Sequence, residues 1–150
     1  MKKYAFRLEA VLKLRKFKEE EVRMQLGQEL VQLNKIDDQL LYEKKEIEKY
    51  YEIQEGALKT GMNGGQLQAF PMMVAGKERN IQLLQRDRKI QERVVEEKKQ
   101  ELAVVRGELK VVENLKEKDF DIYRKAINKE IDQKVEEQTQ IWMQHRDKKA

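Results

Sequence analysis

The side chains that most often carry out covalent and metal chemistry are almost absent from this sequence. It has no cysteine and no serine, its threonines are Thr60 and Thr139, and its single histidine is His145. A cysteine or serine nucleophile is therefore excluded by composition, and so is a metal site built from several histidines. The lack of cysteine also rules out disulfide bonds, which fits a reducing compartment.

Carboxylates are abundant, because charged residues make up 40% of the chain. A pair of carboxylates works as general acid and base only where its pKa values are shifted and water is kept out. The glycines of residues 59–71 form no phosphate-binding loop, since no GxxxxGK[ST] pattern and no preceding strand accompany them. The sequence therefore predicts a protein that is not an enzyme, with no catalytic residues, no cofactor and no bound metal.

Binding chemistry is concentrated at the start of the chain, in FRLEAVLKLRK, residues 6–16. Residues 1–18 carry seven Lys and Arg residues against Glu9 alone, a net charge of +6, while the whole chain carries +4. The rest of the chain is thus slightly acidic. A basic segment with apolar residues could contact an anionic membrane surface, phosphates or an acidic cavity of a protein partner. Nucleic-acid binding is disfavoured, because the other cations are matched by acids and no aromatic platform accompanies them.

The same stretch does not read as a targeting or membrane segment. Its apolar residues are interrupted by Glu9, Lys13 and Arg15, and no small-residue cleavage site follows them. No part of the chain approaches the roughly 20 consecutive apolar residues of a membrane span. The sequence predicts no direct membrane insertion.

The element that must position these residues is a long helix, because apolar residues recur at helical spacing. Leu26, Leu33, Leu40 and Ile47 follow one another at intervals of seven residues, and Ile36 and Tyr50 occupy intervening positions. Upstream, Leu8, Leu12 and Val22 lie on the same helical face, so the opening stretch shares the register of this helix. After residue 71 the heptads resume at Ile81, Leu84, Val95, Leu102, Val105, Leu109 and Val112. The stripe then shifts by four residues, which predicts local unwinding of the supercoil, and continues at Phe120, Tyr123, Ile127 and Ile141.

The break between the two halves is KTGMNGGQLQAFP, residues 59–71. Asn63, Gly64 and Gly65 tolerate positive φ, which indicates a turn, and Pro71 suits the first turn of a following helix. The sequence predicts an all-α fold, a single coiled-coil domain over residues 1–150. Its parts are a helix over about 4–58, a bend over about 59–71 and a helix over about 72–146, folded as an antiparallel hairpin.

Folding about residue 65 would pair residue i with roughly residue 130 minus i. The second helix is longer, so its last 20 or so residues would project beyond the first helix at the end that carries both termini. Ile141 and Trp142 lie in that segment, and we expect it to need a partner.

Several heptad positions are polar. Glu29 and Glu43 occupy core positions of the first helix, and Arg88, Gln91 and Lys98 do so in the second. Such residues could pair across the hairpin or set the register between separate chains. The sequence leaves both possibilities open, including a homo-oligomer in isolation.

Aromatic and methionine side chains gather near the bend. A hairpin tip has too little interior to bury all of them, so we expect part of the group to form an exposed binding patch. Its members are Tyr50, Tyr51, Leu58, Phe70, Met72 and Met73.

The opening residues resemble a known family. The pattern F-R-L-x-x-V-L-x-L-R, here Phe6, Arg7, Leu8, Val11, Leu12, Leu14 and Arg15, is similar to the start of many members of the FliJ family of flagellar export proteins. The chain length, the two-helix plan, the glycine-containing bend and the lack of cysteine are also similar.

This resemblance implies a soluble, cytoplasmic component of the flagellar type III export apparatus, peripheral to the inner membrane at the flagellar base and required for motility and chemotaxis. Family members form an antiparallel coiled coil similar to that of the rotary ATPase γ subunit, insert the end carrying both termini into a hexameric export ATPase, promote its assembly, contact the export gate and handle export chaperones. By this resemblance the motif residues, with Ile141 and Trp142, would face the ATPase, and the patch near the bend would face the gate.

Three other interpretations fit the same shape. The first is the stalk of an injectisome-type secretion system. The second is a prefoldin-like holdase, which is disfavoured because no alternating apolar segment near the bend could supply strands. The third is a dimeric or tetrameric coiled-coil scaffold.

Overall fold

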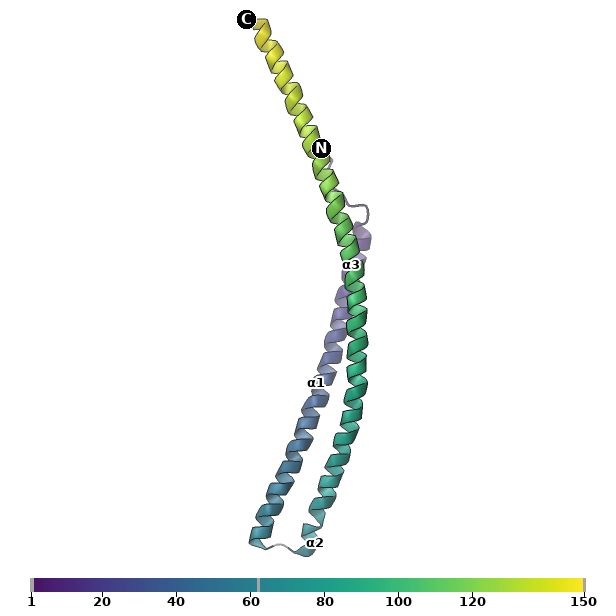
Figure 1. Ribbon diagram of the computed structural model, residues 1–150, viewed down its shortest axis with the longest axis vertical. Helices are drawn as coiled ribbons and strands as arrows, with labels where there is room; N and C mark the ends of the chain where they lie inside the picture. Colours follow the sequence, from purple (N-terminus) through teal and green to yellow (C-terminus); the bar gives the residue numbers. More distant parts are fainter. Residues whose placement is uncertain (1, 62, 150) are drawn as a thin grey trace. The chain divides into compact units, whose positions relative to one another are not determined.

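The computed structural model describes residues 2–61 and 63–149, and these residues form three helices with no strand among them. Helix α1 spans Glu9–Thr60, the short helix α2 spans Gly64–Leu67, and α3 spans Ala69–Lys149. The prediction of an all-α fold made of two long antiparallel helices is confirmed (Figure 1). The chain divides into two compact units: unit 1 comprises Met1–Glu19 with Val104–Ala150, and unit 2 comprises Glu20–Ala103.

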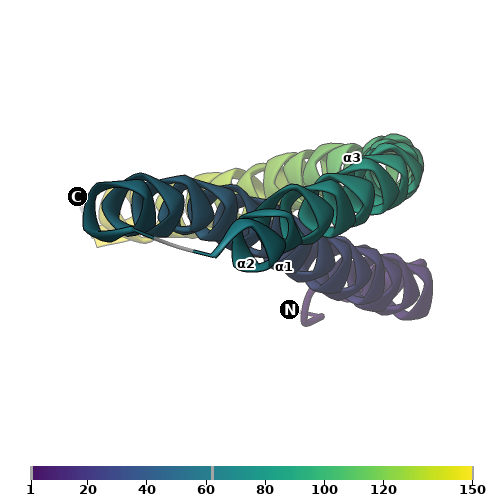
Figure 2. The same cartoon turned by 90° about the horizontal axis from the view of Figure 1, so that it is seen from below.

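Unit 2 contains the turn of the hairpin. Figure 2 shows α1 and α3 as two neighbouring helices at this end, connected through α2. Helix α1 ends where Gly61 adopts φ of 83°, a left-handed conformation that glycine reaches without strain and that commonly terminates helices. The expected positive φ at the Asn63–Gly65 turn is wrong for the glycines there, because Gly64 and Gly65 are helical and the Asn63 side chain caps α2 by accepting from Gly65 N. Pro71 lies in the first turn of α3, as predicted.

The two helices of unit 2 meet along the predicted heptad stripe. The predicted stripe residues Val22, Leu40, Val95 and Leu102 are buried, as is Val74, which was not among the predicted positions. The other stripe positions of this unit are half-buried, namely Leu26, Leu33, Ile36, Ile47, Tyr50, Ile81 and Leu84. An amphipathic helix is stabilised mainly by burying such a stripe, so each long helix depends on the other.

The register of the hairpin differs from the predicted one. Under a fold centred at residue 65, Glu43 would lie opposite Asp87 and Glu29 opposite Glu101. Instead Lys77 lies opposite Glu43, with 3.2 Å between Lys77 Nζ and Glu43 Oε2. The opposing pairs are centred near residue 61, where the chain turns. The observed register places Lys77 opposite Glu43 and Gln91 opposite Glu29. It thereby avoids two juxtapositions of like charge, which favours it over the predicted register.

Unit 1 is held together by both helices and by the residues that precede α1. Leu12, Val105 and Val112 are buried in it. Helix α1 begins at Glu9 instead of near residue 4, because the preceding segment is non-helical and is anchored on α3 by the ring and hydroxyl of Tyr4. The predicted projection of α3 is also observed, since residues 128–149 are all exposed.

None of the helices in the described parts of the chain combines the length and apolarity that crossing a membrane requires. The same residues do not bring three or more His, Cys, Asp or Glu side chains together in an arrangement that could hold a metal ion.

Candidate protein-interaction surfaces

The N-terminal segment of unit 1 is fixed by an aromatic cluster that the sequence analysis did not single out. The ring of Tyr4 lies 5.1 Å from that of Phe120 in an edge-on arrangement and 5.1 Å from that of Tyr123. The Tyr4 hydroxyl donates to Asp119 Oδ2 at 3.2 Å and to the Lys116 carbonyl at 3.3 Å. Tyr123 in turn donates to the Lys2 carbonyl at 2.6 Å. The non-helical segment that precedes α1 is thereby bound to α3.

Ion pairs continue this attachment along α1. Lys116 Nζ donates to Glu9 Oε2 at 2.9 Å, Arg106 Nε donates to Glu19 Oε1 at 3.2 Å, and Arg15 pairs with Glu108. The hydrogen bond from Lys116 lowers the pKa of the Glu9 carboxyl, because it stabilises the ionised form. Three of the basic residues of this unit are thus neutralised within the hairpin.

Unit 1 nevertheless carries a clear excess of positive charge. It contains 18 Lys and Arg residues against 12 Asp and Glu, a net charge of +6, whereas unit 2 contains 14 against 16, a net charge of −2. Among the described residues, the exposed basic side chains near the N-terminus that form no ion pair are Lys2, Lys3, Arg7, Lys13 and Lys16. This exposed charge favours an acidic partner surface.

We expect the Tyr4 phenol to ionise at a higher pH than an ordinary tyrosine does. Its burial against the aromatic cluster, together with the hydrogen bond to the Asp119 carboxylate, raises the pKa of its phenol. A raised pKa means that the attachment is complete below the ordinary tyrosine pKa of about 10 and is lost as the pH rises through the higher value. The near-ultraviolet circular dichroism of the aromatic cluster should fall over that alkaline range.

The control for this titration is a second tyrosine variant. Tyr4→Phe should remove the late step, whereas Tyr51→Phe, which changes an exposed ring in unit 2, should leave it in place. A late step that persists in Tyr4→Phe would contradict the assignment.

The structure separates the residues of the N-terminal motif by exposure. Leu12 is 2% exposed and belongs to the core, whereas Leu14 is 65% exposed. Phe6 and Leu8 are half-buried ahead of α1, Arg7 is exposed, and Val11 and Arg15 lie at the edge of the hairpin. Only Arg7, Val11, Leu14 and Arg15 therefore offer a side chain to a partner, and we call these four the N-terminal surface.

Ile141 and Trp142 are exposed, as is Met143 next to them, and we call these three the C-terminal tip. The guanidinium of Arg146 lies 5.5 Å from the Trp142 ring centroid, which orients the ring by a cation–π contact. The tip lies 18 residues beyond Tyr123, roughly 27 Å along the helix axis. The structure thus does not bring the tip together with the N-terminal surface.

A family comparison decides what kind of protein has this arrangement. The family model described as the flagellar FliJ protein matches residues 3–148 of the 150-residue chain. The chain belongs to the FliJ family. As a FliJ-family protein it is related to flagellar export. Proteins of this family are nonenzymatic components of the export apparatus. The comparisons with curated proteins and with solved structures gave no match.

In this FliJ-family protein the patch near the bend divides between two sides of unit 2. Tyr50 and Met73 line a hollow of about 410 Å³ together with Leu83, whereas Tyr51 lines another of about 280 Å³ with Pro71. Tyr51, Leu58, Met72 and Met73 are exposed, but Tyr50 is half-buried and Phe70 belongs to the core. Phe70 and Tyr50 therefore close the hairpin, and the four exposed residues remain available for binding.

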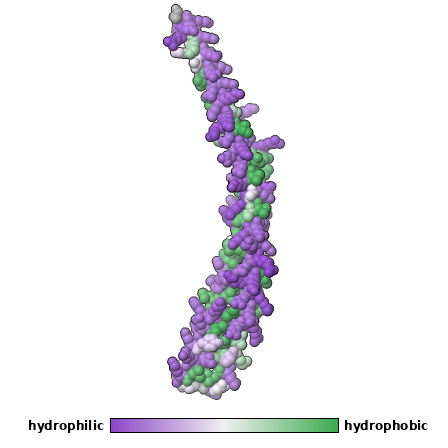
Figure 3. Space-filling view, in the orientation of Figure 1, coloured by the Kyte–Doolittle hydropathy of each residue, from purple (hydrophilic) through white to green (hydrophobic). Residues whose placement is uncertain are grey.

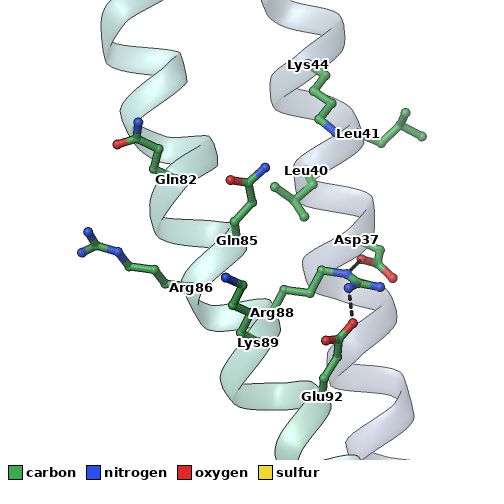
Figure 4. A pocket seen from close by; sticks show the side chains of 10 residues that line it. All are labelled: Asp37, Leu40, Leu41, Lys44, Gln82, Gln85, Arg86, Arg88, Lys89 and Glu92. Carbon is green, nitrogen blue, oxygen red and sulfur yellow. Dashed lines mark hydrogen bonds and ion pairs between the residues drawn. The ribbon is translucent and has the colours of Figure 1, made fainter.

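A hollow with a volume of about 790 Å³ lies on the surface of unit 2. Figure 4 shows Leu40 and Gln85 pointing into the space between α1 and α3, while Arg86 points away. Arg88 reaches across the groove to Asp37 Oδ1 at 2.5 Å and also pairs with Glu92. Both carboxylates of this hollow are therefore engaged by one guanidinium. The groove is open to solvent, so it lacks the enclosure that acid–base catalysis requires.

On the face that Figure 3 shows, hydrophilic residues predominate and apolar areas are scattered among them. Some exposed apolar residues were not predicted from the sequence, because they lie outside the core heptads. These residues are Phe17, Val104, Val111 and Ile122. A search for a second seven-residue repeat, offset from the core stripe, would have found them.

Proposed function

We propose that this protein is a nonenzymatic stalk of the flagellar type III export apparatus. In this proposal unit 1 docks into the hexameric export ATPase and promotes its assembly and turnover, and the exposed residues near the bend face the export gate. The protein also handles export chaperones at the cytoplasmic side of the inner membrane. Membership of the FliJ family supports the setting, and the finer roles are our inference.

The observation that carries the proposal is the composition of unit 1. Its net charge of +6 coincides with exposed apolar residues, Leu14 on α1 and the C-terminal tip on α3. An axial component that enters a protein ring needs a helical surface with charge for steering and apolar anchors for affinity. Unit 2 carries a net charge of −2, so the two units are suited to different partners.

The test adds the purified protein to the hexamer-forming export ATPase of the same organism. We expect stoichiometric protein to increase both hexamer formation, measured by sedimentation velocity, and ATP turnover. Leu14→Asp and Ile141→Asp should each raise the concentration needed for half of this effect by about tenfold, because each removes an exposed apolar anchor.

The matched control is Leu41→Asp, which makes the same change at an exposed leucine of unit 2. It should leave the response unchanged. The proposal is wrong if the wild-type protein alters neither assembly nor turnover of the ATPase. The assignment of unit 1 as the docking unit is wrong if Leu41→Asp abolishes the response while Leu14→Asp does not.

A further inference from the structure

A second apolar stripe follows helix α3 in unit 1, outside the core of the hairpin. The core valines Val105 and Val112 are buried, but the residues just before them, Val104 and Val111, are 62% and 60% exposed. Leu115 and Ile122 are exposed as well. Packing between α1 and α3 does not account for these four residues, so the hairpin leaves them without an intramolecular role.

These four residues share one face of the helix. They follow one another at steps of seven, four and seven residues, which at 3.6 residues per turn keeps them within about 40° of one another. Steps of seven and four are the spacing by which one helix packs along another in a coiled coil. The face is therefore shaped for a further helix.

The residues on this face are arranged symmetrically about position 113. Val104 and Ile122 are equally far from that position, and so are Val111 and Leu115. Glu108 and Lys118, which lie on the same face between them, are also equally far from it and have opposite charges. An identical helix running in the opposite direction would place each apolar residue against an apolar residue and each glutamate against a lysine.

The N-terminal surface lies beside the centre of this face. The ion pairs Glu9–Lys116 and Arg15–Glu108 place the first turns of α1 level with residues 108–116 of α3. Val11 and Leu14 lie in those turns, and both are exposed. Two hairpins meeting through α3 would therefore also bring α1 of each copy to the edge of the contact, as in an antiparallel four-helix bundle.

We propose that two copies of this chain associate through Val104, Val111, Leu115 and Ile122 of α3, antiparallel about a two-fold axis near residue 113. We infer that the partner is a second copy, because the face is complementary to itself. In the antiparallel arrangement, Glu108 of each copy lies opposite Lys118 of the other. The face is short, so the dimer is reversible and forms at high protein concentration. This inference stands apart from the proposed export function.

The first test is a charge exchange followed by sedimentation equilibrium of the full chain over a range of concentrations. Lys118→Glu should weaken the dimer about tenfold or more, because it places glutamates opposite each other twice per dimer. The double variant Glu108→Lys with Lys118→Glu reverses both charges and should restore association to within about threefold of wild type. Lys110→Glu, which makes the same change on another side of α3, should have no effect.

Glu108 also pairs with Arg15 inside the hairpin, so the double variant needs a check on folding. Its thermal unfolding, followed by far-ultraviolet circular dichroism in dilute solution, shows whether the hairpin is intact. Lys118→Glu changes a side chain that is exposed in the hairpin, and its effect on association can be interpreted without that check.

The second test determines the relative direction of the two α3 helices by disulfide formation. The chain has no cysteine of its own, so only the introduced cysteines can form disulfides. A mixture of Val104→Cys and Ile122→Cys proteins should form a mixed disulfide dimer much faster than either protein alone. Faster cross-linking of either protein with itself would overturn the antiparallel arrangement. A wild-type chain that remains monomeric up to about 1 mM would overturn the dimer.

Discussion

Val105→Asp should destabilise the hairpin by about 3–5 kcal/mol, because it places a carboxylate where no polar partner is available. Val105 is 5% exposed and lies in the interface between α1 and α3 in unit 1. For a chain of this size the fall in Tm should be roughly 10 °C or more. Thermal unfolding followed by circular dichroism measures it.

The control for this prediction is the neighbouring valine. Val104→Asp makes the same substitution one residue earlier on the same helix, at an exposed side chain. In dilute solution, where the proposed dimer is dissociated, it should change the free energy of unfolding by less than about 0.5 kcal/mol. Equal effects of the two substitutions would mean that the helical face assigned to the core is incorrect.

Gln91→Leu should destabilise the protein by about 1–3 kcal/mol, although it replaces a polar core residue by an apolar one. Gln91 Nε2 donates to Glu29 Oε2 at 2.6 Å and to the Glu29 carbonyl at 2.9 Å. Both residues are half-buried. Removing the donor leaves the carboxylate partly desolvated with no replacement, and an unsatisfied group of this kind is more harmful than an apolar pair.

The double variant Glu29→Leu with Gln91→Leu should therefore recover the loss and reach or exceed the stability of wild type. We expect a coupling free energy of about 1 kcal/mol or more in the double-mutant cycle, measured by urea unfolding. Leu41→Ala, at an exposed position of the same unit, should show no coupling to Gln91→Leu. If Gln91→Leu is as stable as wild type, the hydrogen bond from Gln91 does not stabilise the Glu29 carboxylate, and the prediction is wrong.

The same double variant should also lose specificity. The double substitution removes one of the polar pairs from the core, and a more uniformly apolar core distinguishes less well between one register or partner and another. Sedimentation velocity of the double variant should reveal additional oligomers at concentrations where wild type shows none. The polar pairs of unit 2 then act chiefly to select the observed register.

The core stripe was predictable from sequence because helical burial imposes a strict period. Leu40, Val95, Leu102, Val105 and Val112 were assigned to the core from their spacing, and all are buried. The position on α3 where its interface with α1 ends was predictable to within a few residues, because α3 is longer than α1 and extends beyond it. The last half-buried residue is Ile127, close to the expected limit.

The start of α1 and the hairpin register could not be predicted from local sequence. FRLEAVLKLRK has helical spacing throughout, yet Phe6 and Leu8 precede the helix. The segment before the helix is held by Tyr4, which contacts Phe120 and Asp119, more than a hundred residues away in the sequence. A contact of that sequence separation leaves no periodic signal. Likewise, Lys77 and Gln91 became the partners of Glu43 and Glu29 only once the turn fixed which residues lie opposite each other.

The sequence by itself determined the helical class, the position of the bend, the core stripe and the family resemblance, because each depends on residue type and spacing along one chain. Tertiary structure alone decided which motif residues are available to partners. Leu12 and Leu14 are two residues apart and look alike in sequence, but packing against α3 buries the first and exposes the second. The physical reason is that the exposure of a side chain depends on which residues of the opposing helix lie against it. The turn at Gly61 and the contacts between the two helices, such as Lys77–Glu43, fix that arrangement.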